Sequence, residues 1–481
     1  MIRLLNIDLF IAAGEIYLIW VLLVIILVGL VSEIRVVLRL LVLVLIVELV
    51  LQLDGCIMLR GALVFNGHWY FNKLGTLFIV LMNIIFIVIV IQSIYFVKLE
   101  RRIGFELFLL MFLGFFSLVC LIRANDFVLF YLCLEWYSLC MYVLANIGRI
   151  SNFGTEAGLK YYVLGALSSG FSLFGFLVCY GMTGLTIYND YEIFMLCENG
   201  ERLVVGVFFM SVGLLFKLGV APFHVWVPDI YEGSSTLVTM YFSLLPKIGL
   251  LCVFLRLNNS VFYELHSKGF VYLCCIVLVS LLTGTIGGLF QSKMKRLMAY
   301  SSIAHGGYLL MPLILLTHFG LFGFSVYIII YVLMVVNVFS ILLCIRGITV
   351  DRVFKLIVRL GIIMKSKYYL GMGLMISVLS LAGFPPFAGF YSKVCVFISL
   401  IGSGNYSLFF CMVFFSVIGG IYYLRLVRML CFNRERWVNM RGISSIAGYL
   451  ISFFTHIIVF FSIYNIPVIL LCQSEMLYGL L

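Results

Sequence analysis

Charged residues are scarce in this 481-residue sequence: Asp, Glu, Lys and Arg together make up 11% of it, whereas hydrophobic residues make up 64%. Soluble domains carry about 25% charged residues, so a chain this poor in charge cannot cover itself with polar surface in water. Mean hydropathy is +1.22, and apolar runs recur along the whole length. The composition therefore excludes a soluble protein and predicts one integral membrane domain over 1–481.

Closely grouped cysteines are also absent, although the sequence contains 14 of them. No C-x-x-C occurs, and the nearest pairs are the adjacent Cys274 and Cys275 and the more distant Cys133 and Cys140. Zinc and iron–sulfur sites need thiolates that lie close together, so we expect these cysteines to be buried packing residues. The sequence therefore predicts no metal site and no redox centre on this chain.

Nucleotide-binding and catalytic motifs are missing as well. The glycine-rich stretch from Gly284 to Gly288 lies inside an apolar run, and no lysine follows it at P-loop spacing, so it is typical of helix packing. The sequence shows no dinucleotide fingerprint, nucleophile elbow or catalytic-triad spacing. We therefore expect no cofactor on this chain, and neither NADH nor flavin bound to it.

The positive net charge of +11 lies in short loops between apolar runs, which argues against nucleic acid as a partner. Basic residues follow the odd-numbered runs, and the loop after the sixth run is acidic. Cytoplasmic-side loops of membrane proteins carry an excess of Lys and Arg, so the bias predicts that both termini lie on the outer side. The loop residues that carry the bias are Arg35, Lys98, Arg101, Arg102, Arg149, Lys293, Lys295, Arg296, Arg346, Arg352, Lys355, Arg359, Lys365, Lys367, Arg434, Arg436 and Arg441, against Asp190, Glu192, Glu198 and Glu201.

Apolar runs long enough to cross a bilayer, about 20 residues each, recur along the chain. The first begins near Leu9 and is long enough to span, so we expect a helix that stays rather than a cleavable targeting segment. The pattern predicts an all-α polytopic membrane protein with about 14 transmembrane helices. Their approximate cores are 9–30, 37–57, 77–97, 104–122, 127–147, 160–182, 204–221, 235–256, 270–290, 297–316, 320–345, 370–400, 406–428 and 445–472.

Proline interrupts two of these runs. The seventh ends in Lys217-Leu-Gly-Val-Ala-Pro-Phe-His224, and the twelfth contains Leu381-Ala-Gly-Phe-Pro-Pro-Phe-Ala-Gly389. Proline removes a backbone donor and kinks a helix, and backbone freed at membrane depth is tolerated only beside protein or a water-filled cavity. The candidate helix-break residues are therefore Pro222, Pro385 and Pro386, together with Pro246 inside the eighth run.

The two interruptions resemble each other. Gly219-x-x-Pro222-Phe223-x-x-Trp226 matches Gly383-x-x-Pro386-Phe387-x-x-Phe390 at an offset of 383 − 219 = 164 residues, and at this offset Ser138 falls on Ser302. Paired broken helices in two halves of a sequence indicate a repeat-built transporter. Chance agreement between two short Gly/Pro/Phe breaks is the alternative.

Four charged residues lie far from the ends of their apolar runs: Glu135, Lys217, Lys247 and Lys393. A charge at the bilayer centre costs about 2.5–3.5 kcal/mol on insertion scales, so each needs a reason. In one interpretation the lysines snorkel or form ion pairs that only pack helices. In the other, the four form a proton relay, in which a Glu135–Lys217 pair forms and breaks to load and release a proton.

Two histidines could join such a relay, because the pKa of histidine lies near neutrality. His224 lies at the first interruption, and His305 lies inside the tenth run. A lone buried histidine is more often a satisfied packing group, which is the alternative for both. We interpret Glu48, late in the second run, as an interfacial residue or a member of a local pair, and leave His68, His266, His318 and His456 unassigned.

Four stretches resemble the N-type (subunit 2) antiporter-like family of respiratory complex I. They occur in the family's order within about 125–395, whereas the first 100 residues and the last 60 are similar only as apolar helices. The stretches are Glu156-Ala-Gly-Leu-Lys-Tyr-Tyr-Val-Leu-Gly-Ala-Leu-Ser-Ser-Gly170; Ala221-Pro-Phe-His-Val-Trp-Val-Pro-Asp-Ile-Tyr-Glu-Gly233 followed by Thr236 and Pro246-Lys247; Arg296-Leu-Met-Ala-Tyr-Ser-Ser-Ile-Ala-His305; and Leu381-Ala-Gly-Phe-Pro-Pro-Phe-Ala-Gly-Phe-Tyr-Ser-Lys393.

The resemblance implies two inverted five-helix repeats, over 104–256 and 270–430, with N-terminal helices in 1–103 and a last helix at 445–472. It implies a proton half-channel in each repeat. Glu135 matches the family's glutamate on helix 5, Lys217 its paired lysine on helix 7, Lys247 the connecting lysine on helix 8, and Lys393 the terminal lysine on helix 12.

The resemblance also implies partners. The partners are other membrane-arm subunits of complex I, including further antiporter-like subunits, and lipids; NADH, FMN, iron–sulfur clusters and ubiquinone bind to other subunits. Composition indicates the location: residues whose codons need cytosine are scarce, with 7 Pro and 6 His, whereas 45 Phe and 43 Gly are present, which is typical of a strand-biased organellar genome. We therefore expect the mitochondrial inner membrane, with the bacterial plasma membrane as the alternative. The rival functions are a subunit of a multi-subunit cation/proton antiporter and a non-pumping structural membrane subunit.

Overall fold

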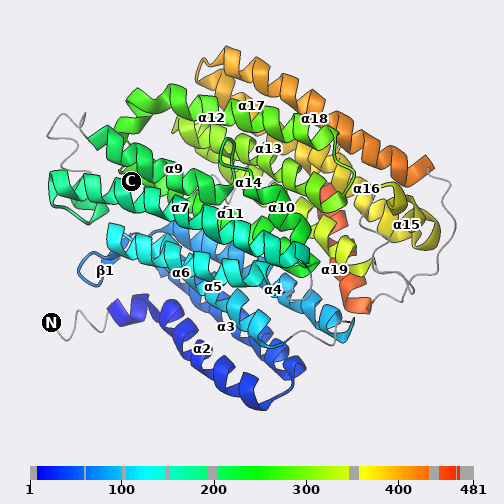
Figure 1. Cartoon of the computed structure of the whole chain (residues 1–481), viewed down its shortest axis with the longest axis horizontal. Helices are drawn as coiled ribbons and strands as arrows, with labels where there is room; N and C mark the ends of the chain where they lie inside the picture. The colour runs from blue at the N-terminus through cyan, green and yellow to red at the C-terminus, as the bar shows by residue number, and fades with distance from the viewer. Residues whose placement is uncertain are drawn as a thin grey trace. The chain divides into compact units, whose positions relative to one another are not determined.

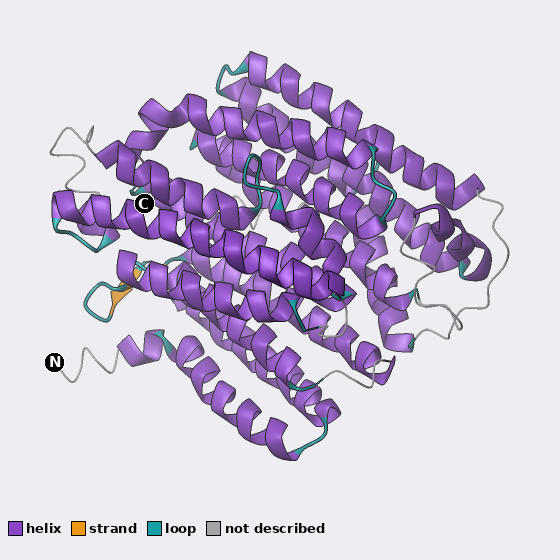
Figure 2. Cartoon of the chain, viewed as in Figure 1, coloured by secondary structure: helices purple, strands orange, loops and turns teal. Residues whose placement is uncertain are grey.

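The computed structural model is built almost entirely of α-helices, with one short pair of strands (Figure 2). Several of the basic and acidic loop residues used above lie outside the described residues: Arg101, Arg102, Arg149, Glu192, Glu198, Glu201, Arg346, Arg352, Lys355, Arg434, Arg436 and Arg441. The structure describes residues 8–58, 61–99, 104–147, 152–191, 203–261, 263–345, 357–432, 444–461 and 463–465.

The chain divides into two compact units, of which unit 1 is formed by residues 1–218, 233–270 and 477–481. In it, α5 packs on α6, α6 on α7 and α7 on α9, while α11 contacts α4, α5, α6 and α9 (Figure 1). The elements of unit 1 are α2 (Ala13–Val31), α3 (Ile34–Met58), β1 (Ala62–Val64), β2 (Trp69–Phe71), α4 (Lys73–Leu99), α5 (Glu106–Arg123), α6 (Phe127–Ala145), α7 (Asn152–Thr183), α9 (Val204–Leu218) and α11 (Thr236–Asn259).

Unit 2 is formed by residues 219–232 and 271–476. Its centre is α14, which packs on α13, α16, α17 and α19. The elements of unit 2 are α10 (Trp226–Gly233), most of α12 (Tyr263–Leu289), α13 (Met294–Leu315), α14 (His318–Cys344), the 3₁₀ turn Ile357–Leu360, α15 (Gly361–Ser366), α16 (Tyr368–Ala382), α17 (Ala388–Gly402), α18 (Tyr406–Phe432) and α19 (Ser445–Phe460).

Every one of the 14 expected spans overlaps a helix in the described residues, and eleven of those helices are long and apolar enough to cross a membrane. The other three expected spans coincide with shorter apolar helices: α9, the pair α16 and α17, and α19. The prediction of a multi-pass all-α membrane protein is therefore confirmed, while the count of 14 spans stays a prediction.

Side chains cap several helices where the sequence provides them. Asp126 precedes α6, and its carboxylate accepts a hydrogen bond from the backbone N–H of Val128 at 3.0 Å. Thr317 does the same for α14, accepting from Gly320 at 3.1 Å. Such caps satisfy donors that a helix end leaves unpaired, which matters where little water is present.

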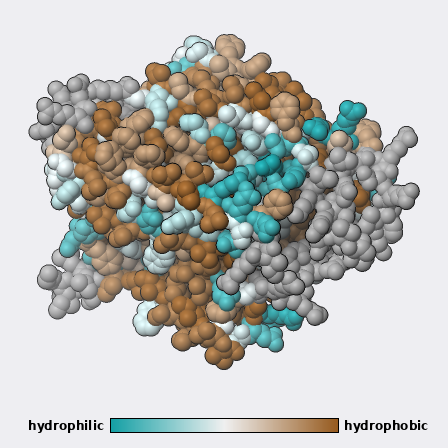
Figure 3. Space-filling model, viewed as in Figure 1, coloured by the Kyte–Doolittle hydropathy of each residue, from teal (hydrophilic) through white to brown (hydrophobic). Residues whose placement is uncertain are grey.

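The outer face of α18 carries large exposed apolar side chains at helical spacing. Phe410, Phe414, Val417, Ile421 and Leu424 follow one another by three or four residues, and each is at least 45% exposed. Residues three and four apart share one face of a helix, so the five form a continuous apolar stripe. Hydrophobic side chains cover much of the visible surface (Figure 3), as expected for a surface that faces lipid tails.

A polar cap ties the loops of unit 1 together. The guanidinium of Arg256, at the end of α11, donates hydrogen bonds to the backbone oxygen of Ala124 at 2.7 Å and to Oδ1 of Asn125 at 2.6 Å. His68, in the turn between β1 and β2, contacts the Asp126 carboxylate through Nδ1 at 2.9 Å. Tyr188 packs beside Arg256, and burial holds the pKa of its phenol well above the usual range, so the ring stays neutral.

Candidate functional site

Glu135 and Lys217 lie in unit 1, on α6 and on the last turn of α9. The Lys217 side chain is only 7% exposed, and among the described residues its Nζ atom has no hydrogen-bond partner. Glu135 accepts a hydrogen bond from Ser138 on one carboxylate oxygen at 3.3 Å, while its other oxygen is buried and lacks a described partner. The two charges act on each other electrostatically without a direct hydrogen bond.

An ammonium that is buried without a partner is costly, because burial removes water and nothing replaces it. A purely structural lysine is usually held by a carboxylate or a carbonyl, and Lys217 has neither among the described residues. In this structure the Glu135–Lys217 pair is therefore separated, with an electrostatic interaction but no hydrogen bond between the two groups.

Lys247 is the second buried lysine of unit 1. It is 8% exposed and follows Pro246 inside α11, whose apolar membrane-spanning stretch is buried throughout. Proline at this position removes one backbone hydrogen bond of the helix and frees a carbonyl one turn earlier. The expected mid-helix proline and lysine thus lie together at the centre of a helix that contacts four others in unit 1.

The first interruption begins where α9 ends at Leu218. Gly219 has a left-handed φ of 71°, and a Cβ atom there would come within 2.5 Å of Cγ2 of Val227. Both the backbone conformation and the space therefore require glycine at this position. His224 lies in the segment that follows; its side chain is half-buried and its Nδ1 atom is buried without a described hydrogen-bond partner.

The short helix α10 then carries two acidic residues that contact the start of α13, both within unit 2. Arg296 donates a hydrogen bond to the Asp229 carboxylate at 2.8 Å through Nη2 and forms an ion pair with Glu232, whose Oε2 lies 2.8 Å from Nε; Lys293 also contacts Glu232. In the sequence, Lys293 and Arg296 were grouped with the loop charges and had no predicted partner. The sequence does not indicate which residues lie close together in space, so only the fold could reveal that Arg296 pairs with Asp229.

Replacing Arg296 with Ala is expected to weaken the attachment of α10 by about 1 kcal/mol, because partly exposed ion pairs contribute little each. The loss of intact protein with rising temperature, followed at low and at high salt, measures this effect. Salt screens exposed pairs, so the difference between variant and wild type should shrink at high salt. Arg425→Ala is the control, since Arg425 is exposed and donates a hydrogen bond to the Leu289 carbonyl oxygen rather than to a carboxylate. An equal loss in both variants contradicts the assignment.

The second interruption separates α16 from α17. Gly383 has a φ of 85°, and the backbone N–H groups of Gly383 and Phe384 donate to the Ser380 and Leu379 oxygens at 2.9 and 3.2 Å. This is a Schellman ending, in which a left-handed glycine closes the helix. Pro385 and Pro386 follow in the exposed part of the turn, as expected for residues that cannot continue a helix.

Lys393, on α17, reaches back to this ending. Its Nζ atom donates to the Ala382 carbonyl oxygen at 2.7 Å and lies 5.5 Å from the centre of the Tyr308 ring. The ammonium is 7% exposed and sits at the negative end of the α16 dipole. Lys393 therefore has a stabilising partner, unlike Lys217, although a carbonyl cannot accept its charge.

His305 lies in α13 among buried tyrosines of unit 2. Its Nδ1 atom is 2.7 Å from the Tyr327 hydroxyl and its Nε2 atom is 3.2 Å from the Tyr423 hydroxyl. Both ring nitrogens thus have hydroxyl partners, and the Tyr308 ring that lies 5.5 Å from the Lys393 Nζ is 6.3 Å from the imidazole. The sequence indicated His305 but not its tyrosine partners, because they come from helices 22 and 118 residues away.

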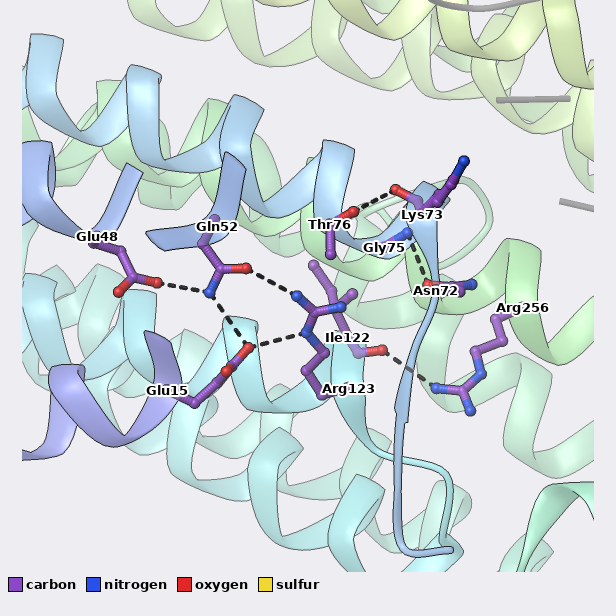
Figure 4. A network of polar contacts seen from close by, with 10 residues as sticks. All are labelled: Glu15, Glu48, Gln52, Asn72, Lys73, Gly75, Thr76, Ile122, Arg123 and Arg256. Atoms are coloured by element: carbon purple, nitrogen blue, oxygen red, sulfur yellow. Dashed lines mark hydrogen bonds and ion pairs between the residues drawn. The ribbon is translucent and has the colours of Figure 1, made fainter. Parts of the chain in front are cut away.

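Two further buried ionisable residues were not predicted. Glu15, on α2, and Arg123, at the end of α5, form an ion pair at 3.0 Å with both side chains 1% exposed (Figure 4). Glu48, predicted to be interfacial or locally paired, is 0% exposed and accepts a hydrogen bond from Gln52, one turn away, at 2.9 Å. Glu15 and Arg123 lie near helix ends, where charge needs no special explanation, so the sequence provided no signal for them.

The chain is similar to a known membrane protein family. The family model described as "NADH:quinone oxidoreductase/Mrp antiporter, TM" matches residues 124–419. NADH-ubiquinone oxidoreductase chain 2 of Marchantia polymorpha is 40% identical over 385 residues, 78% of each chain, and NADH-quinone oxidoreductase subunit N 1 of Rhizobium meliloti is 38% identical over 333 residues, 69% of each. A chain of respiratory complex I from Thermus thermophilus, solved with bound aureothin, is similar with a TM-score of 0.81 and 26% identity, covering 95% of this chain and 98% of that one.

Proposed function

We infer that this chain translocates protons for respiratory complex I. It belongs to the NADH:quinone oxidoreductase/Mrp antiporter family and, within that family, to NADH-ubiquinone oxidoreductase chain 2 and its bacterial counterpart, subunit N. It is a membrane-arm subunit of a proton-translocating NADH:ubiquinone oxidoreductase. Oxidation of NADH and reduction of ubiquinone take place on other subunits, and FMN and the iron–sulfur clusters belong to those subunits as well.

The observation that supports the inference best is the separated pair formed by the partly buried Glu135 and the buried Lys217. Lys217 is 7% exposed and its Nζ atom has no described partner, while the Glu135 carboxylate has one unpartnered oxygen. Each group can therefore gain or lose a proton in response to the charge of the other. Bringing the two together favours both charged forms, and separating them favours release of the lysine proton. A conformational or electrostatic signal from the redox subunits would act by shifting this balance.

The remaining groups divide between the two units. In unit 1, Lys247 would receive the proton from the Glu135–Lys217 pair, because it is the other buried lysine that the described part of this unit contains. In unit 2, Lys393 would deliver a proton to the outer side, with His305 and His224 as exchanging groups. Lys393 and His305 both approach the Tyr308 ring, which supports a connected polar region around them.

The relatives support the proposed location, and the charge bias of the loops supports the proposed orientation. We propose that the chain lies in the mitochondrial inner membrane, with the bacterial plasma membrane as the alternative, and that both termini lie on the outer side. Two inverted repeats over 104–256 and 270–430 would form one half-channel each. The proposed partners are the other membrane-arm subunits, including further antiporter-like subunits, and lipids.

A native gel tests the assignment to complex I. Membranes solubilised in mild detergent are separated and stained for NADH dehydrogenase activity, and mass spectrometry locates this chain. We expect it in the large stained band. Migration only in a smaller band without NADH activity would contradict the assignment and favour a cation/proton antiporter, for which sodium-dependent proton flux is the next assay.

Lys393→Met is expected to lower proton translocation severalfold in assembled complex, because methionine fills the space but carries no proton. Lys393→Arg should fail to restore it, since arginine keeps its charge and does not release a proton at accessible pH. The measurement is proton uptake into vesicles driven by NADH oxidation. Lys160→Met is the matched control, because Lys160 forms an exposed pair with Glu156; recovery in Lys393→Arg would show that only the charge matters.

A further inference from the structure

Helices α2, α3 and α5 of unit 1 contain a buried charged cluster that the proposed relay does not use (Figure 4). It consists of Glu15 on α2, Glu48 and Gln52 on α3, and Arg123 on α5. The exposed fractions of the three charged residues are 1%, 0% and 1%, and that of Gln52 is 4%. Charges are rarely buried this deeply unless they are paired, so the pairing decides what the cluster can do.

The hydrogen bonds place the positive charge on one of the two carboxylates. Arg123 donates to Oε1 of Glu15 at 3.0 Å through Nε and to Oε1 of Gln52 at 2.9 Å through Nη2. The Gln52 amide in turn donates to Oε1 of Glu48 at 2.9 Å and to Oε1 of Glu15 at 3.4 Å. Glu48 thus accepts a hydrogen bond from a neutral amide, whereas Glu15 accepts one from the charged guanidinium of Arg123.

Counting charges shows that the cluster needs a proton. With both carboxylates ionised, two negative charges face one positive charge, which leaves one uncompensated negative charge in an apolar surrounding. Taking such a charge out of water costs so much that the group takes up a proton instead. Loss of a proton from Arg123 would increase the net negative charge of the cluster, so a carboxyl must be the protonated group.

The cluster also has unused hydrogen-bonding capacity. Oε2 of Glu15, Oε2 of Glu48 and Nη1 of Arg123 are all buried and have no partner within the described residues. An oxygen of this kind is where an acid proton resides. Because the two carboxyls accept from the same amide and act on each other electrostatically, they gain and lose protons as a coupled pair.

The other groups that act on the cluster are few. Tyr17 on α2 interacts electrostatically with Glu48, and Cys120 on α5 with Glu15. The aromatic ring of Phe71 lies 4.3 Å from the Arg123 guanidinium carbon. On α4, which packs against α3, Asn83 is 0% exposed with both amide atoms unpartnered in the described part of the chain. Arg256, at the end of α11, acts electrostatically on Arg123. Its guanidinium donates to the Ile122 and Ala124 backbone oxygens and to Asn125, and none of its hydrogen bonds in the described residues reaches Glu15 or Glu48.

We propose that Glu15 and Glu48 form a proton-binding site that holds one exchangeable proton, with Arg123 as its counter-ion and Gln52 as the bridge between the two carboxyls. The site lies in α2, α3 and α5 and is separate from Glu135, Lys217, Lys247 and Lys393. It adds a titratable proton to unit 1 whether or not the relay works as proposed.

Infrared difference spectroscopy of the assembled complex tests the proposal, because a protonated carboxyl has a C=O stretching band that a carboxylate lacks. The band should appear in wild type and shift on exchange into deuterium oxide. Glu48→Gln leaves Glu15 against Arg123, and Glu15→Gln leaves Glu48 against Arg123. Each variant then needs no proton to be neutral, so each alone should remove one whole band.

Glu156→Gln is the control, since Glu156 is an exposed carboxylate paired with Lys160, and it should leave the band unchanged. If Glu15→Gln does not assemble, Gln52→Leu replaces it. This variant keeps all three charges but removes the hydrogen bond to Oε1 of Glu48, so the band should remain and move to higher frequency. The proposal is overturned if wild type shows no band, or if the wild-type band survives in Glu48→Gln. It is also overturned if Glu15→Gln or Gln52→Leu leaves the band unaltered.

Discussion

Glu135→Ala is expected to lower proton translocation coupled to NADH oxidation roughly tenfold, while the complex still assembles. The variant removes the carboxylate that acts on Lys217, and a loss of about 1.4 kcal/mol in a proton-transfer step slows it tenfold. Assembly should survive because Glu135 is only partly buried and accepts its hydrogen bond from Ser138, one turn away on its own helix. Proton uptake per NADH oxidised, measured in reconstituted vesicles, gives the result.

The matched control for this variant is Glu156→Ala. Glu156 forms an exposed i,i+4 pair with Lys160 at 2.8 Å, and such pairs contribute about 0.3–0.5 kcal/mol. Glu156→Ala should change proton translocation little. That result would show that the loss in Glu135→Ala is not a general response to the removal of a carboxylate. Lys217→Ala should reproduce the Glu135→Ala loss. Full pumping by an assembled Glu135→Ala enzyme would refute the gating role while leaving the family assignment intact.

Gly389→Ala is expected to abolish assembly. A Cβ atom at this position would lie 1.7 Å from the backbone oxygen of Ser380 and 3.1 Å from the sulfur of Met334. A backbone oxygen cannot move away as the end of a side chain can, so α17 would have to separate from α16. The helices pack this closely only because small residues lie between them. The amount of assembled complex on a native gel measures the effect.

Gly420→Ala provides the contrast. Gly420 lies in α18 and is also buried, but a Cβ atom there would meet nothing within 4 Å. Alanine is about 1 kcal/mol more favourable than glycine inside a helix, so this variant should assemble as well as wild type or slightly better. Equal assembly of the two variants would show that α16 and α17 are not packed as described.

The sequence by itself determined the class, the family and the main positions of interest. Runs of apolar residues are local, and each of the 14 predicted segments overlaps a helix in the described residues. The Gly/Pro interruptions were likewise visible as patterns, and α9 and α16 end at Leu218 and Ala382, each followed by a left-handed glycine. The roles assigned to Glu135, Lys217, Lys247 and Lys393 remain predictions, although all three lysines are buried.

Only the tertiary structure decided which side chains meet. The partners of His305 come from α14 and α18, those of Arg296 from α10, and those of Arg123 from α2 and α3, 108 and 71 residues earlier in the chain. Helical periodicity specifies which face of a helix is apolar, but not which helix covers it or at what height two side chains lie opposite each other. Burial also depends on that packing, so the difference between an end-of-helix charge and a fully buried one, as at Glu15 and Arg123, cannot be found in local sequence.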